Sequence, residues 1–284
     1  MANPLLSLAA AAARWLPAPL RRSLYRLGPI SSGLRSALNR AAPKGLTEVE
    51  VAGGALAGTR MILDMQKEKD YWLGTYEIDL QQAVNDFVKP SMVAYDVGAN
   101  IGYVSLILAK QVGPKGKVIT FEPLPKNQER FQKQLRLNQD AQIQLIPMAV
   151  GETTGKKEFL VHRSGGMGKI SGAIGRDTQY KDAIEVECTT LDDFIFKEGN
   201  PQPHIVKIDI EGGEGLALQG ADKLISEIKP LFIIELHGKD AAEECWLILT
   251  GAGYTIHKLA RNYPEVTSVS ELDWKSYILA RPKG

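Results

Sequence analysis

The chain has 284 residues, of which 44% are hydrophobic and 24% are charged, and its formal net charge is +1. The length allows one large α/β domain with an appendage or two small domains, of which we expect one main domain, and the composition excludes a transmembrane span of roughly 20 unbroken apolar residues. The two cysteines, Cys188 and Cys245, lie far apart without CxxC spacing, which argues against a disulfide framework or a zinc cluster and indicates a reducing compartment.

The charge is unevenly distributed along the chain. Residues 1–47 contain seven Arg or Lys and no acid, and the remaining 27 basic and 33 acidic residues give the body a net charge of −6. This basic, Ala- and Leu-rich segment fits peripheral membrane contact through residues 1–44, or a helical arm packed on the body, which its prolines and glycines favour. No basic residue precedes Leu5, which disfavours a secretory signal, so we expect a cytoplasmic protein, peripheral to the membrane if the arm binds lipid.

The pattern of apolar runs predicts three parts, a basic helical arm (1–45), a β cap with a helical lead-in (46–90) and the main domain (91–284). In the cap, glycines separate two β-rich runs, 47–51 and 60–63, which we expect to pair antiparallel. Beyond it, apolar and helical runs alternate, which predicts a doubly wound parallel sheet. The expected strands are 92–97, 117–121, 143–149, 205–210, 231–236, 254–259 and 276–280, and the expected helices are 102–111, 125–138, 215–228 and 241–249.

A long interruption separates the third and fourth strands. We expect a hairpin of residues 157–162 and 184–190, which carries the glycine-rich loop 164–175. Long loops in compact domains are often functional, so we interpret this one as a substrate lid, with a passive linker as the alternative.

The first strand leads into a turn that predicts a nucleotide-like ligand. Residues 96–102, Asp-Val-Gly-Ala-Asn-Ile-Gly, join a strand to a helix start. Gly98 and Gly102 permit positive φ and close backbone approach, and the amides of Ala99 and its neighbours are candidate donors. Asp96 is expected to orient these amides or to receive a ligand ammonium group, with a helix N-cap as the alternative.

The second strand ends in Glu122 and Pro123, where a carboxylate can accept both ribose hydroxyls of a nucleoside; a solvated loop acid is the alternative. A nicotinamide-binding fingerprint would need glycine at the third and sixth places, where this chain has Asn100 and Tyr103. The pattern Asp-x-Gly-x-Asn-x-Gly fits S-adenosylmethionine enzymes better. A nicotinamide-dependent oxidoreductase is therefore the competing hypothesis.

Several motifs in order resemble the FkbM family of S-adenosylmethionine-dependent methyltransferases. They lie at residues 71–77, 96–102, 121–123, 148–151, 190–194, 206–214 and 235–237. The resemblance implies a Rossmann-like seven-stranded methyltransferase sheet whose last strand is inserted antiparallel, and transfer to an oxygen acceptor. Gly213 is a minor departure, since the family often has alanine there, and residues 1–45 lie outside the resemblance.

The fourth and fifth strands end in charged residues. Period-two alternation places Lys207, Asp209 and Glu211 on one side of the fourth strand, and Glu235 and His237 share a face of the fifth. Since ligands bind beyond the carboxyl ends of parallel strands, we predict these five residues as the catalytic group. The alternative is a satisfied ionic network of Lys207 with Asp209 or Glu211.

Methyl transfer to an alcohol requires a base for the hydroxyl proton. His237 is the candidate, because an unperturbed pKa of about 6.5 makes it neutral near pH 7, and Asp209 would orient it or the acceptor. Asp209, Glu235 and His237 also form a set for a divalent cation, which we do not favour because no spacing motif demands it, so no metal ligand is predicted.

Three other residues are candidates for cofactor contact. Tyr76 and Glu77 are expected to fold over the cofactor, with Trp72 as an apolar wall or merely as packing in the cap. Ala149 would place a small side chain beside the adenine.

The expected partner is a small-molecule, glycan or lipid acceptor rather than nucleic acid, because the body is acidic. A non-catalytic membrane-associated binding module is the remaining alternative. The sequence specifies neither the acceptor nor the oligomeric state.

Overall fold

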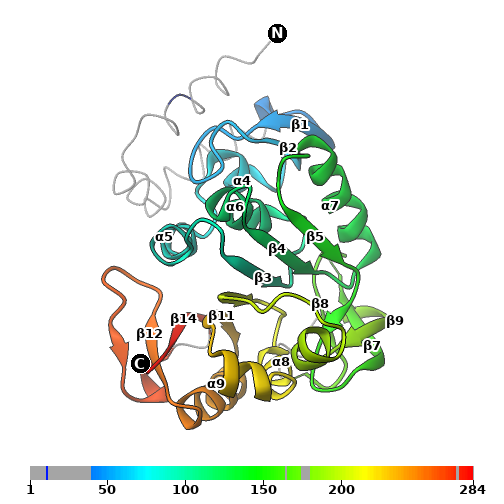
Figure 1. Cartoon of the computed structure of the whole chain (residues 1–284). Helices are drawn as coiled ribbons and strands as arrows, with labels where there is room; N and C mark the ends of the chain where they lie inside the picture. Colours follow the sequence, from blue (N-terminus) through cyan, green and yellow to red (C-terminus); the bar gives the residue numbers. More distant parts are fainter. Residues whose placement is uncertain (1–10, 12–39, 164, 174–179, 273–274, 284) are drawn as a thin grey trace. The chain divides into compact units, whose positions relative to one another are not determined.

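The computed structural model describes residues 11, 40–163, 165–173, 180–272 and 275–283 (Figure 1). These form two compact units, one from the described part of Met1–Gln82 with Lys133–Gln139, the other from Ala83–Gln132 with Asp140–Gly284. The predicted N-terminal arm lies outside the described residues except for residues 11 and 40–45.

The first unit contains the expected antiparallel pair. β1 (Leu46–Glu50) pairs with β2 (Arg60–Asp64), and α4 (Lys69–Leu73) and the start of α5 (Ile78–Phe87) follow. Gln134, near the end of α7 (Pro125–Leu137), donates to and accepts from the backbone of Ile62 at 2.8 Å. Both groups of the Gln134 amide are therefore used in holding β2.

The second unit contains an eight-stranded mixed sheet that confirms the predicted fold class. Its order is β13-β12-β14-β11-β10-β3-β4-β5, and the strands are β3 (Val93–Val97), β4 (Lys117–Phe121), β5 (Ile143–Ile146), β10 (Ile205–Ile208), β11 (Leu231–His237), β12 (Tyr254–Lys258), β13 (Glu265–Val266) and β14 (Lys275–Pro282). β14 runs antiparallel between β11 and β12, as the resemblance implied. The seven expected strands are present, and the two-residue β13 adds an eighth at the edge.

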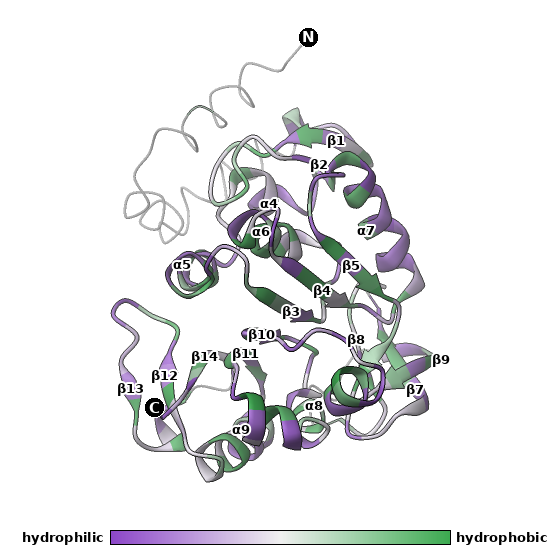
Figure 2. Ribbon diagram, viewed as in Figure 1, coloured by the Kyte–Doolittle hydropathy of each residue, from purple (hydrophilic) through white to green (hydrophobic). Residues whose placement is uncertain are grey.

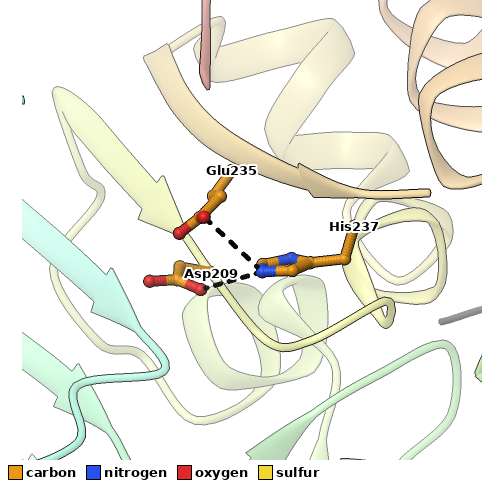
Figure 3. A group of neighbouring side chains, drawn as sticks. All are labelled: Asp209, Glu235 and His237. Carbon is orange, nitrogen blue, oxygen red and sulfur yellow. Dashed lines mark ion pairs between the residues drawn. The ribbon is translucent and has the colours of Figure 1, made fainter. Parts of the chain in front are cut away.

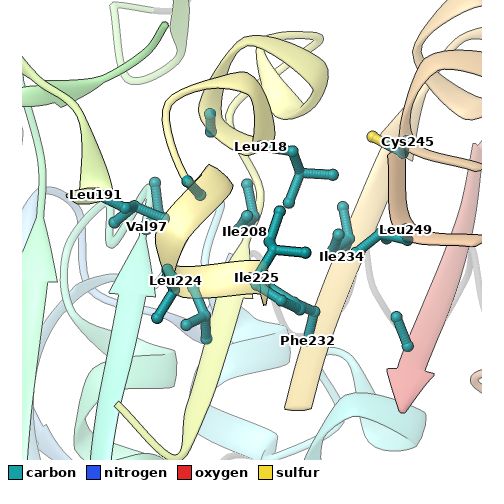
Figure 4. Packing of buried hydrophobic residues seen from close by; sticks show 14 of the residues in the cluster. Val97, Leu191, Ile208, Leu218, Leu224, Ile225, Phe232, Ile234, Cys245 and Leu249 are labelled. Atoms are coloured by element: carbon teal, nitrogen blue, oxygen red, sulfur yellow. The ribbon is translucent and has the colours of Figure 1, made fainter. Parts of the chain in front are cut away.

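The main core lies on one face of this sheet. Alternate residues of β3, β10 and β11 pack there, namely Tyr95, Val97, Val206, Ile208, Phe232 and Ile234. They contact side chains from α8 (Glu214–Gln219), α9 (Lys239–Gly251) and two short π-helical turns, η1 (Asp193–Lys197) and η2 (Leu224–Ile228), shown in part in Figure 4. Figure 2 shows the hydrophobic colouring of the central strands.

Because side chains alternate along a strand, Asp96, Lys207, Glu235 and His237 fall on the opposite face. α6 (Tyr103–Val112) contributes to this face, since Ser105 hydrogen-bonds Asp96. The charged residues of β3, β10 and β11 thus share one face of the sheet, near the carboxyl ends of these strands.

A second, four-stranded sheet forms the predicted hairpin region. Its order is β6-β9-β7-β8, with β6 (Ala149–Val150), β7 (Gly155–His162), β8 (Gly168–Ile170) and β9 (Tyr180–Thr189). β7 and β9 pair antiparallel, which confirms the hairpin. Residues 164 and 174–179 of the glycine-rich region lie outside the described residues.

Three predicted boundaries are wrong. The third strand ends at Ile146 rather than at residue 149, since Ala149 and Val150 pair with β9 in the second sheet. The fourth strand ends at Ile208, because Glu211 has a φ of +57° that ends the extended backbone. The expected helix 215–228 divides into α8 and η2, and Gly220 lies between them.

Among the described residues, none of the helices combines the length and the apolar character that a membrane crossing requires.

The turn after β3 depends on glycine. Gly98 has a φ of +84°, and a Cβ built on it would lie 1.9 Å from the carbonyl oxygen of Asp209. Gly102 has a φ of +87°, and its Cβ would lie 2.2 Å from the Phe131 ring. The predicted need for glycine is confirmed, and the missing Cβ of Gly98 brings the turn against the end of β10.

Replacing Gly98 with alanine should therefore destabilise the protein by roughly 2–4 kcal/mol, from left-handed strain plus collision with Asp209. Gly113 is a matched control, since its φ is +67° and nothing lies within 4 Å of its Cβ position. Gly113→Ala should cost only about 1–2 kcal/mol, from left-handed strain alone. Denaturant unfolding checks both; equal losses would contradict the packing role of Gly98.

Candidate active site

The site begins at Asp96, the fully buried carboxylate near the end of β3. Its Oδ2 accepts a hydrogen bond of 2.6 Å from the Ser105 hydroxyl, and its Oδ1 lies 3.0 Å from the Lys207 ammonium. The carboxylate is thus fixed by one hydroxyl and one charge, so the N-cap alternative is not what the structure shows.

The amides of the turn are used within the chain. Those of Gly98 and Ala99 both donate to the Phe121 carbonyl at 3.0 Å, and that of Gly102 donates to Ala99. The amide of Asn100, which has a φ of +51°, donates to Glu122. These four amides are therefore bonded within the chain and hold the turn in shape, and the cofactor contacts of the turn stay a prediction.

Glu122 is the acid that ends β4, and it is buried rather than solvated. Its Oε2 accepts from the Asn100 amide at 2.8 Å and its Oε1 from the Leu124 amide at 2.9 Å, while Pro123 between them is partly buried. Burial raises its pKa to about 7, although these hydrogen bonds oppose the shift. The Asn127 side chain also hydrogen-bonds this carboxylate, so three of its roughly four acceptor positions are used within the chain and one is left for a ligand hydroxyl.

Part of the glycine-rich loop lies against the turn. The carbonyl of Gly166 accepts from the side-chain amides of Asn100 at 3.4 Å and Asn127 at 3.1 Å. The described part of the loop therefore contacts the predicted cofactor turn, which is where a lid would lie. The lid function itself stays a prediction.

Lys207 joins the turn to the next group of charges. Its side chain is only 3% exposed, and its ammonium donates to the Gly98 carbonyl at 3.0 Å. It also pairs with Asp96 at 3.0 Å and with Asp209 at 3.6 Å. Burial alone would lower the pKa of Lys207, but Asp96 and Asp209 outweigh it and raise the pKa above its usual value.

Four carboxylates surround the His237 ring at the ends of β10 and β11 (Figure 3 shows two of them). Nδ1 lies 2.9 Å from Glu214. Nε2 lies 3.9 Å from Asp209, 3.8 Å from Glu211 and 3.7 Å from Glu235. The structure thus brings together all five predicted catalytic residues, including Glu211, although the fourth strand ends before it.

These charges shift one another's pKa values. Burial alone would lower the pKa of His237, but the hydrogen bond to Glu214 and the charges of Asp209 and Glu235 raise it to about 9. Burial raises the pKa of Asp209 to about 7 against the opposing charge of Lys207. The neutral imidazole assumed from an unperturbed pKa is therefore not what these surroundings favour.

Glu214 is a member of this group that sequence reasoning did not assign. It is fully buried in the first turn of α8, and its Oε1 also accepts from the amides of Ile210 at 3.2 Å and Gly212 at 3.1 Å. Its place at a helix start just after two glycines could have indicated an acid that holds a turn. Two residues of β14 were also missed: Tyr277 donates to Glu235 at 2.6 Å, and Lys275 lies 3.0 Å from it.

Three other residues were predicted to contact the cofactor. Ala149 is buried in a core cluster with Leu124, Phe159 and Cys188, and its place beside the adenine stays a prediction. Tyr76 and Glu77 belong to the first unit, where the Tyr76 carbonyl accepts from Gln81 at 2.6 Å. Trp72 is buried there, as the packing alternative requires. Both cysteines are free and buried.

The strand order, with its inserted antiparallel strand, and a glycine turn followed by a buried acid define the class of Rossmann-like methyltransferase domains. The chain belongs to the FkbM methyltransferase family, since the family model described as "Methyltransferase FkbM domain" matches residues 96–256, more than half of the chain.

Among curated proteins, the chain is 26% identical over 176 residues to the hexuronic acid methyltransferase AglP of Haloferax volcanii. That match covers 62% of this chain and 65% of the relative, just under two thirds of its length.

Two of the solved structures to which the chain shows similarity are a bacterial and an archaeal protein. A methyltransferase FkbM from Methylobacillus flagellatus is 20% identical, with 76% of this chain and 53% of that chain covered and a TM-score of 0.45. Aeropyrum pernix fibrillarin in complex with S-adenosyl-L-methionine is 10% identical, with 71% and 74% covered and a TM-score of 0.42. The strand order itself, rather than these similarities, establishes the fold class of this chain.

The electrostatics around His237 can be tested by NMR titration of the metal-free protein. His237 should titrate near pH 9, and Glu214→Gln should lower this pKa, because it removes the nearest negative charge. Since the folded pKa is raised, the stabilisation is present below pH ~6.5 and is lost as the pH rises through 9. Glu185→Gln, on an exposed β9 carboxylate, is the control; a wild-type pKa near 6.5 would refute the assignment.

Proposed function

We propose that this chain is an S-adenosylmethionine-dependent O-methyltransferase. The observation that carries the proposal is the Lys207 bridge, which sets a group of acids directly beside the glycine turn. S-adenosylmethionine supplies an electrophilic methyl group on a sulfonium, and positioning the acceptor and removing its proton fall to the chain.

The residues around the turn suit that cofactor. It carries a sulfonium and an ammonium group, and the acids Asp96, Glu122 and Asp209 outnumber the one buried lysine there. Glu122 would accept from a ribose hydroxyl with its remaining acceptor position, beside Asn100 and Pro123. Gly98, Ala99 and Gly102 keep the turn in the shape that this contact needs.

The acids at the strand ends suit proton removal from a hydroxyl. The side chains of Asp209 and Glu211 are each 21% exposed, whereas those of Glu235 and Glu214 are almost fully buried. A carboxylate with a pKa near 7, as burial gives Asp209, is well matched to a base at neutral pH. His237 would then act as a positive positioning residue, rather than as the base assumed from its unperturbed pKa.

The acceptor we favour is a glycan hydroxyl. Support comes from the Haloferax volcanii relative, which is a hexuronic acid methyltransferase. A small molecule and a lipid-linked molecule are the other acceptors of the same chemistry.

The wider predictions are part of the proposal. We keep the division into 1–45, 46–90 and 91–284, a cytoplasmic location, and peripheral membrane contact through residues 1–44. Tyr76 and Glu77 remain proposed cofactor contacts, and Lys207 is a positioning residue between cofactor and acceptor.

A transfer assay with labelled S-adenosylmethionine and hexuronic acid glycosides tests the function. The wild-type chain should release S-adenosylhomocysteine, and Asp209→Asn should slow kcat by about 10²–10⁴-fold, as expected for loss of a general base. Calorimetry should show S-adenosylhomocysteine binding to both proteins, because Asp209 is proposed to act on the acceptor.

Glu185→Gln is the control, because its carboxylate is on the exposed face of β9 and pairs with Lys156. Failure of the wild-type chain to bind S-adenosylhomocysteine would refute the proposed cofactor. Full activity of Asp209→Asn would refute the proposed base.

A further inference from the structure

The two ring nitrogens of His237 make different kinds of contact. His237 is 3% exposed, and its Nδ1 makes an ordinary hydrogen bond of 2.9 Å to Glu214. Its Nε2 lies 3.7–3.9 Å from three carboxylates and has no hydrogen bond among the described residues. A protonated imidazole normally donates to a carboxylate at about 2.7–2.9 Å, so these distances are too long for direct bonds.

The spacing instead suits an ion that lies among the groups. Ligand atoms of Asp209, Glu235 and His237 lie within 4.8 Å of one another (Figure 3). Two ligands at about 2.1 Å from one ion lie at most about 4.2 Å apart, and the Nε2 distances to Asp209 and Glu235 fall inside that limit. The partly exposed Asp209 has room to make the small adjustment that the widest pair requires.

The groups behind the three ligands hold them in place. Glu214 binds Nδ1 of His237, which fixes the ring and directs Nε2 toward the carboxylates. Tyr277 donates to Oε2 of Glu235 at 2.6 Å, and Oε1 of Glu235, which lies 3.0 Å from the Lys275 ammonium, faces His237. A carboxylate on the second nitrogen of a ligating histidine is typical of metal sites.

We infer that Asp209, Glu235 and His237 form a binding site for one divalent transition-metal cation, such as Mn²⁺. One imidazole and two carboxylates suit a first-row transition ion better than Ca²⁺, which takes oxygen ligands. Glu211, also 3.8 Å from Nε2 and 21% exposed, lies at the rim as a further ligand or as the proton acceptor. Lys275, 3.0 Å from Glu235 and 45% exposed, would move away into solvent.

The role of this ion rests on the proposed function, since a bound cation would lower the pKa of an acceptor hydroxyl on it. In the cation-bound protein Asp209 and a neutral His237 are ligands, so Glu211 takes the place of Asp209 as the proton acceptor. The binding of the ion does not depend on the proposed function, and it can be measured without cofactor or acceptor.

The test titrates chelator-treated full-length protein with Mn²⁺ and measures free Mn²⁺ by electron paramagnetic resonance. Wild-type protein should bind one Mn²⁺, and Asp209→Asn and His237→Gln should each weaken binding by at least about tenfold. Glu214→Gln should also weaken it, because the ring loses its support. Glu185→Gln, an exposed carboxylate beside Lys156, should bind like the wild type.

Two results would overturn the inference. The first is that the wild-type protein binds no Mn²⁺ at millimolar Mn²⁺ concentration. The second is that the wild type, Asp209→Asn and His237→Gln bind Mn²⁺ equally, which would place the ion elsewhere on the surface. Circular dichroism checks that each variant is folded. If a variant is not folded, the wild-type titration alone tests whether the protein binds one Mn²⁺. S-adenosylhomocysteine calorimetry on the same samples keeps the two proposals separate, since either ligand can bind without the other.

Discussion

The site depends on one buried ammonium group. Lys207 lies on the central strand β10 and reaches the Gly98 carbonyl, Asp96 and Asp209. A buried lysine of this kind persists only when carboxylates compensate for its lost hydration, and the carboxylates in turn need the lysine. The interaction therefore ties the turn after β3 to the end of β10. Gly98 allows this junction to be tight, because the Asp209 carbonyl occupies the space that a Cβ on Gly98 would need.

The alternation of side chains explains why charged residues gather near the carboxyl ends of these strands, on the face opposite the main core. The alternation that packs Val206 and Ile208 into the main core directs Lys207 to the other face, and the same holds for Glu235 and His237 on β11. Since β3, β10 and β11 are neighbours, their charged residues fall side by side. Negative charge concentrates around His237, and either a proton or a bound cation must balance it. The proposed transfer to a hydroxyl needs a region of this kind, because that acceptor must lose a proton beside the methyl donor.

Much of this arrangement could be predicted from the sequence, because it follows from periodicity. The strand 117–121 matches the expectation, since apolar runs and turns are local features, whereas the pairing of β14 between β11 and β12 was implied by the family resemblance. Glu122 was found for the same reason, as an acid at a strand end. The errors arose where tertiary contacts decide: Ala149 joins a second sheet, and Glu211 turns out of the strand at positive φ. Glu214 was missed because its partners, His237 and two backbone amides, meet only in the folded chain. The raised pKa of His237 was unpredictable for the same reason.

The account stands on the claim that Lys207 and its carboxylates stabilise each other as one buried unit, and a double-mutant cycle of unfolding free energy tests it most directly. Lys207→Met should cost about 3–5 kcal/mol, because it leaves Asp96 buried and uncompensated, and adding Asp96→Asn should recover a large part of that loss. A Lys207→Met protein within about 0.5 kcal/mol of the wild type, or losses that simply add in the double variant, would contradict the claim.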